Sequence, residues 1–158
     1  MTYQSVGPVR FEPVTNVTAT NSTEVGTRCT ENGVEYVYVY NDGGSSILSG
    51  YGAVLQSGAS GMSVTVSSVT SADFCVGVAV NTLTTATYGW LATRGIVAIE
   101  AGTTIASRGN FELGGNGTFD PHSNTSGGTL PGAISPFVGQ ALAEIVTGAS
   151  GNAYISCL

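Results

Sequence analysis

Apolar and polar residues alternate along much of the chain with the two-residue period that is typical of β-strands. The clearest run is Val34-Glu35-Tyr36-Val37-Tyr38-Val39-Tyr40, in which β-branched and aromatic residues dominate. Asn32-Gly33 before this run and Asn41-Asp42-Gly43-Gly44 after it have the composition of turns. The pattern predicts a strand over residues 34–40. Its stripe of tyrosines favours a packed or paired face over a binding cleft.

The middle of the chain predicts further strands. Residues 53–56 and 63–67 flank a Gly/Ser-rich segment and together predict a hairpin. Residues 74–80 are almost continuously apolar, which is typical of a strand buried on both faces or of a core strand of a barrel. Residues 88–94 and 95–99 predict two more strands, paired through a turn around Arg94-Gly95.

The last third begins with a Gly/Ser/Thr/Asn-rich segment over residues 114–136, which predicts a long loop. Residues 137–146 have a helical periodicity, but Gly139 interrupts it and turn residues follow at Gly148, so we favour a strand. Residues 154–158 predict a closing strand. The tetrapeptide Gly-Ala-Ser-Gly occurs at 58–61 and again at 148–151. It is explained equally well by an internal duplication and by two similar hairpin turns.

Residues 1–26 predict an extended arm, because Pro8, Pro13 and a Thr/Asn-rich run disfavour a helix. Two interpretations stay open, a frayed terminus and an arm that lies on a neighbouring subunit. Residues 27–158 then predict a single β-domain. The expected fold class is therefore all-β, a small antiparallel β-barrel or sandwich with an extended N-terminal arm.

The composition is unusually poor in charge. Charged residues make up 9% of the chain and hydrophobic residues 42%, whereas an ordinary soluble domain has about 25% charged residues. The surface is therefore built largely from Ser, Thr, Asn and Gly. Because interface cores are depleted in charged residues, this composition favours a surface that is largely covered in an assembly over a neutral soluble domain with polar loops.

The charges also limit the partners. Lysine is absent, the four cations are all arginines, and the net charge is −6 with a pI of about 4.4. Nucleic-acid binding needs clustered cations, so we expect no nucleic-acid partner. Residues 1–14 lack the features of a signal peptide, and no apolar stretch reaches the length of a membrane span. These features predict a protein folded in a cytoplasm, without a membrane partner.

The three cysteines are Cys29, Cys75 and Cys157, and they form no Cys-x-x-Cys motif. With His122 as the single histidine, they predict no zinc site. In a reducing cytosol we expect them to be small buried hydrophobes. The alternative of one disulfide and one remaining thiol stays open.

The sequence contains no clear catalytic motif. His122 lies in a loop beside Asp120 and Ser123, too close in sequence to favour a triad, and no Gly-x-Ser-x-Gly motif is present. No acidic pair is marked for glycoside hydrolysis, and no loop has enough acids for calcium. We therefore expect no catalytic residues, no metal and no cofactor, and hence a protein that is not an enzyme.

Trp90 is the single tryptophan, and Tyr88 lies two residues before it. Three interpretations stay open for it: core packing, an anchor at an interface, and a platform for carbohydrate stacking. The residues that we select as interface candidates are aromatic, cationic or part of the arm. They are Arg10, Phe11, Pro13, Tyr88, Trp90 and Arg94.

Three segments together resemble the capsid decoration (cement) proteins of tailed phages. These are Cys75-Val76-Gly77-Val78-Ala79, Tyr88-Gly89-Trp90-Leu91 with Gly95 after it, and Gly139-Gln140-Ala141-Leu142. Gly26-Thr27-Arg28 and the strand at 36–40 are also similar to phage structural proteins. The resemblance covers roughly residues 26–158 and departs at the loop 114–136.

The resemblance implies a small β-protein that is made in the host cytoplasm and binds the outside of an assembled capsid, often as a homotrimer, with the major capsid protein as its partner. Such a protein stabilises the assembled state by mass action and needs no reaction. Two alternatives stay open. One is another virion component, such as a head fibre base, a tail tube or a receptor-binding module, and the other is a carbohydrate-binding β-module.

Overall fold

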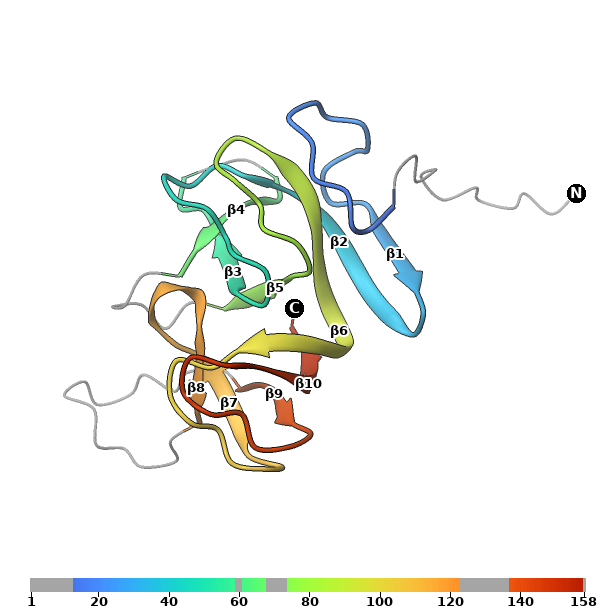
Figure 1. The fold of residues 1–158 in the computed structure, drawn as a ribbon. Helices are drawn as coiled ribbons and strands as arrows, with labels where there is room; N and C mark the ends of the chain where they lie inside the picture. The colour runs from blue at the N-terminus through green and yellow to red at the C-terminus, as the bar shows by residue number, and fades with distance from the viewer. Residues whose placement is uncertain (1–12, 59–60, 68–73, 123–136, 158) are drawn as a thin grey trace, which may run out of the picture.

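The computed structural model describes residues 13–58, 61–67, 74–122 and 137–157, and this part of the chain is all-β (Figure 1). Its ten strands form one sheet in the order β1-β2-β4-β3-β5-β6-β10-β9-β7-β8. The elements are β1 (Arg28–Glu31), β2 (Val34–Asn41), β3 (Gly52–Leu55), β4 (Ser63–Val66), β5 (Cys75–Ala79), β6 (Tyr88–Glu100), β7 (Asn110–Leu113), the 3₁₀ turn η1 (Gly115–Gly117), β8 (Phe119–Pro121), β9 (Phe137–Ala141) and β10 (Ser150–Ser156). The predicted fold class is confirmed.

The sheet closes on itself in its first half. Strands β2, β4, β3, β5 and β6 form a ring, because β2 also pairs with β6. Four of the five pairings are antiparallel, and the short pairing of β2 with β4 is parallel. We call this ring the first barrel. Its interior is aliphatic and consists of Val37, Val39, Ile47, Ala53, Val64, Val76, Ala79, Leu83 and Leu91.

A second ring repeats this arrangement and shares β6 with the first. Strands β6, β10, β9, β7 and β8 pair in that order, and a parallel bridge between Ala101, directly after β6, and Phe119 of β8 closes the ring. We call it the second barrel. The rings of Phe111 and Phe119 meet edge to face in its interior, with centroids 5.3 Å apart.

The backbone register shows that the two barrels are two copies of one five-strand pattern. Ala53 lies opposite Gly77 in the first barrel, and Phe111 lies opposite Gly139 at the same place in the second. A register shift directly follows both pairs. The residues of the first core have counterparts in the second that often differ in size: Ala53 corresponds to Phe111, whereas Leu91 corresponds to Ala153.

The same corner joins the strands at four places in the described chain. In each corner a buried aliphatic residue bridges to another corner, and the residue three positions later has a positive φ. The amide of that later residue donates a hydrogen bond of 2.8–3.0 Å to a carbonyl at the end of a strand or, for Gly148, directly after it. The four pairs of buried and positive-φ residues are Ile47 and Gly50, Leu83 and Ala86, Ile105 and Arg108, and Ile145 and Gly148.

The predicted turn at Arg94-Gly95 is wrong. Residues 88–100 form one strand, β6, which bends where Gly95 adopts a φ of 122° (Figure 1). The half before Gly95 pairs with β2 and β5, and the half after it pairs with β10. The two halves cannot pair with each other, because each serves a different barrel.

Several other expected elements are confirmed. Residues 53–56 and 63–67 form the antiparallel pair β3–β4, and every residue of β5 is buried. The strand expected over residues 137–146 is confirmed only as far as Ala141, where β9 (Phe137–Ala141) ends and a corner begins. The expected closing strand begins earlier than the alternation indicates, at Ser150.

The expected loop over residues 114–136 is wrong in its first part. Phe119–Pro121 form β8, which pairs with β7 and fills the second barrel with the Phe119 ring. Residues 123–136 lie outside the described part. The repeated Gly-Ala-Ser-Gly does not mark the duplication, since Gly148 lies in a corner whereas Gly58 lies in the β3–β4 connection.

Residues 13–27, which we call the N-terminal segment, lie along the first barrel. Thr18 forms a bridge with Tyr88 of β6, and Gly26 and Thr27 exchange backbone hydrogen bonds with Tyr38 of β2. Val14 is buried in the cluster that contains Tyr38 and Trp90. Residues 1–12 of the predicted arm lie outside the described part, so its contact with a neighbouring subunit stays a prediction.

Candidate interaction surface

Each barrel has an outer sheet face made by equivalent strands. In the first barrel, Tyr36, Ala92 and Val78 lie side by side across β2, β6 and β5. In the second barrel, Ile96, Tyr154 and Gln140 occupy the same row across β6, β10 and β9. Side chains in one cross-strand row point to one face of a sheet. The two rows can therefore be compared position by position.

The outer face of the first barrel is covered. Tyr36 and Trp90 are 8% and 1% exposed, and Tyr38 is fully buried. The rings of Tyr38 and Trp90 lie 5.0 Å apart. Val14 and Val25 of the N-terminal segment belong to the same cluster. This face is therefore part of the core of the chain.

The outer face of the second barrel is open. Ile96 is 56% exposed and Tyr154 is 41% exposed, and they lie opposite each other. Leu142, directly after β9, is 47% exposed and hydrogen-bonds through its amide to the carbonyl of Asn152. Large apolar side chains that gather on one sheet face mark an interaction site more often than single ones do. We call this surface the open face: Ile96, Ala98, Gln140, Leu142, Asn152 and Tyr154.

An ion pair borders the open face. The Nε of Arg94 donates a hydrogen bond of 3.1 Å to the Tyr154 hydroxyl, and its guanidinium lies 3.8 Å from a carboxylate oxygen of Glu35. The pKa of Arg94 is raised by the hydrogen bond to Tyr154 and, to a smaller extent, by Glu35. An exposed pair of this kind contributes little to stability. It does orient the Tyr154 ring at the edge of an otherwise uncharged face.

The structure places the interface candidates that the sequence indicates in different environments. Arg10 and Phe11 lie outside the described residues, and Pro13 is exposed. Tyr88 is half-buried, with its ring 4.6 Å from that of Tyr40. Arg94 is exposed and borders the open face.

Trp90 packs in the core, so the core-packing interpretation is the one that the geometry supports. With 1% exposure, the indole contacts the chain's own residues and offers no surface to a partner or a sugar. Its Nε1 is buried without a hydrogen-bond partner among the described residues.

Sequence reasoning missed Ile96, Leu142 and Tyr154. All three lie in largely apolar stretches, but so do Tyr36 and Trp90, which are covered. No signal in the sequence tells the two faces apart, because burial of the first face depends on residues distant in sequence, Val14 and Val25 among them.

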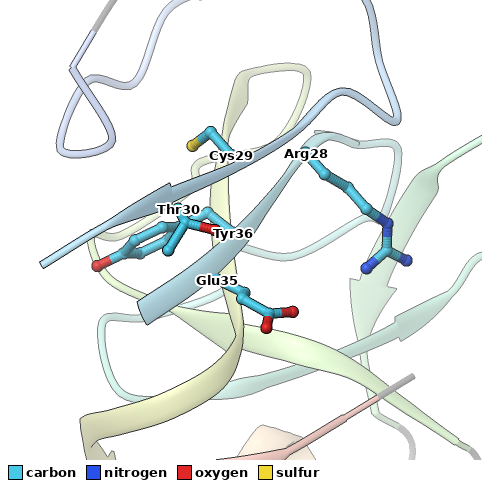
Figure 2. Close-up of a pocket in the computed structure, with 5 residues that line it drawn as sticks. All are labelled: Arg28, Cys29, Thr30, Glu35 and Tyr36. Atoms are coloured by element: carbon cyan, nitrogen blue, oxygen red, sulfur yellow. The ribbon is translucent and has the colours of Figure 1, made fainter. Parts of the chain in front are cut away.

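A small hollow of about 130 Å³ lies beside β1 and β2, lined by Arg28, Cys29, Thr30, Glu35 and Tyr36 (Figure 2). Figure 2 shows that the side chain of Cys29 points away from those of Arg28 and Glu35. Polar groups that bind a small molecule must converge on it. This hollow therefore lacks the arrangement of a ligand site.

The remaining chemistry-bearing groups are scattered in the described part of the chain. His122 Nδ1 lies 2.7 Å from a carboxylate oxygen of Glu112, a local contact between β7 and the residue directly after β8. The described residues contain no group of three or more His, Cys, Asp or Glu side chains placed to hold a metal ion. Within the same residues, no helix has the length and apolar character needed to cross a membrane.

Comparison with solved structures finds a phage protein. The chain is similar to the head fibre gp8.5 N base of bacteriophage phi29, with a TM-score of 0.55 and 18% sequence identity. The similarity covers 77% of this chain and 94% of that chain. At this identity the similarity shows a shared fold. No family model and no curated protein matches the chain.

Proposed function

We propose that this protein is a non-enzymatic structural component of a phage particle, carried on the outside of the head. The observation that carries the proposal is the shared fold, which extends over 94% of the phi29 head fibre base. The low charge and the open face support it independently, because both favour a protein that acts through contact with other subunits.

The specific role that we propose is that of a decoration protein that binds the major capsid protein as a homotrimer and stabilises the assembled shell. A protein that binds only the assembled state stabilises that state by mass action. Full burial of a large apolar side chain contributes about 1.5–3 kcal/mol, so the three half-exposed side chains of the open face supply about 2–4 kcal/mol per copy. Several linked copies multiply such modest contacts.

A second candidate function is the base of a head fibre. The fold similarity favours it directly, since the similar structure is itself a head fibre base. A decoration protein and a fibre base both attach to the head. They differ in the number of copies and in what the attached protein carries.

Quantitative mass spectrometry of purified particles from the source of this chain tests the proposal. A copy number close to that of the major capsid protein supports decoration, and a much smaller number supports a fibre base. Absence from the particles would overturn the structural role.

A binding experiment complements the copy number. The purified protein should cosediment with empty expanded capsids and raise their melting temperature, and it should leave unassembled capsid subunits unbound. Equal binding to free subunits would contradict the mechanism, because it would not favour the assembled shell.

A further inference from the structure

Two cysteines from different barrels meet in the folded chain. Cys75 begins β5 of the first barrel, and Cys157 directly follows β10 of the second. Their Sγ atoms are 3.4 Å apart, with the Cys157 thiol donating to the sulfur of Cys75. The Cys75 thiol in turn donates to the carbonyl of Gly77 at 3.6 Å.

Backbone contacts hold the two thiols in place. The amide of Cys157 donates a hydrogen bond of 2.8 Å to the carbonyl of Thr93 in β6. Cys75 is 4% exposed, in a strand that is buried throughout. The two cysteines are 82 residues apart in sequence, so the whole second barrel after β6 lies between them. The fold, and not the local sequence, brings them into contact.

We propose that Cys75 and Cys157 form a disulfide bond when the folded protein meets a low-molecular-weight disulfide such as oxidised glutathione. The disulfide would crosslink the segment after β10 to β5 and so add a covalent link between the two barrels. This inference does not depend on the proposed function.

The reaction is a pair of thiol–disulfide exchanges. The half-buried Cys157 loses its proton and attacks one sulfur of oxidised glutathione, which forms a mixed disulfide and releases one glutathione thiolate. Cys75 then loses its proton and attacks the Cys157 sulfur, which forms the protein disulfide and releases the second glutathione thiolate. Both thiolates take up the released protons, so two protein thiols are oxidised and one small disulfide is reduced.

The environment sets the rate of the first step. The hydrogen bond to Cys75 and burial raise the pKa of Cys157 well above its ordinary value. Since the thiolate is the nucleophile, oxidation should be slow at neutral pH and should accelerate as the pH rises. In a reducing cytosol the two cysteines stay reduced, whereas in an oxidising medium they form the disulfide.

Incubation of the full chain with oxidised glutathione at pH 8, followed by mass spectrometry, tests the proposal. We expect the mass to fall by two hydrogens and peptic peptides to link Cys75 with Cys157. Closing a loop of this length should raise the melting temperature by about 10 °C, and reduction should reverse the rise.

Two variants make the test specific. Cys29→Ser should oxidise like the parent chain, whereas Cys157→Ser should show neither the loss of mass nor the rise in melting temperature. A link that involves Cys29, or a protein that stops at a glutathione adduct, would overturn the proposal. An unchanged mass after long incubation would overturn it too, provided that the unfolded chain oxidises under the same conditions.

Discussion

Tyr36 and Ile96 occupy the same position in the two barrels, but Tyr36 is buried and Ile96 is exposed. The register establishes the equivalence, because Tyr36 lies opposite Ala92 as Ile96 lies opposite Tyr154. Tyr36 belongs to a buried cluster that also includes Val14 and Val25 of the N-terminal segment, whereas no described segment of the chain covers Ile96. The duplicated scaffold therefore has one face that belongs to the core and one that is open to a partner.

Substitution of the open face should separate binding from folding. The double variant Ile96→Ser with Tyr154→Ser should weaken binding to empty capsids at least about tenfold, because it removes two exposed apolar contacts. Its melting temperature should fall only slightly, since both side chains are about half exposed in the isolated protein. Cosedimentation and thermal unfolding measure the two effects.

Leu55→Ser is the matched control, because Leu55 is equally exposed but lies on β3 of the first barrel. It should bind capsids like the parent chain. Equal losses in the control and the double variant would mean that the open face has no special role.

Gly77 and Gly139 should tolerate no side chain. A Cβ on Gly77 would lie 2.7 Å from the carbonyl oxygen of Ala92, and one on Gly139 would collide with the carbonyl oxygen of Tyr154, the equivalent atom. Gly77→Ala and Gly139→Ala should each lower the free energy of unfolding by about 2–3 kcal/mol in chemical denaturation. Gly44→Ala is the control, since a Cβ there would have no atom of the described chain within 4 Å. Comparable losses in Gly44→Ala would refute the steric explanation.

The bend of β6 should depend on Gly95. Its φ of 122° is unfavourable for other residues, and a Cβ there would lie 3.0 Å from the carbonyl oxygen of Gly33. Gly95→Ala should cost about 1–3 kcal/mol of stability, measured as a lower denaturation midpoint. A variant as stable as the parent chain would show that the bend does not require glycine.

The fluorescence of Trp90 should report a buried indole. Native emission should be blue-shifted and weakly quenched by acrylamide, and both properties should change on unfolding. Simple sugars should leave the emission unchanged. Saturable quenching by a sugar would instead support a carbohydrate-binding module.

Truncation of Trp90 should also be costly. Trp90→Ala should lower the free energy of unfolding by about 3–5 kcal/mol, because it leaves a cavity in the core. Trp90→Phe should cost less, since it keeps most of the packing and removes the buried Nε1, which has no hydrogen-bond partner among the described residues. Equal losses in the two variants, measured by chemical denaturation, would contradict a packing role.

The sequence by itself determined the all-β class and most of the strands. Alternation marks β2, turn residues mark the β3–β4 hairpin, and a continuous apolar run marks β5. These signals are local, because strand periodicity and turn chemistry depend on neighbouring residues. The same local rules led to the wrong turn at Gly95, where a glycine within a strand permits a bend instead of a reversal.

The tertiary structure alone decided which residues meet and which stay exposed. The duplication is weak in the sequence because many equivalent side chains differ, as Ala53 and Phe111 show, although Gly77 and Gly139 are the same residue. Alternation specifies that one side of a strand is apolar, but it cannot say whether another segment covers that side. Burial of Trp90, exposure of Ile96 and the contact of Cys75 with Cys157 all depend on chain segments that are distant in sequence, and only the folded chain brings these together.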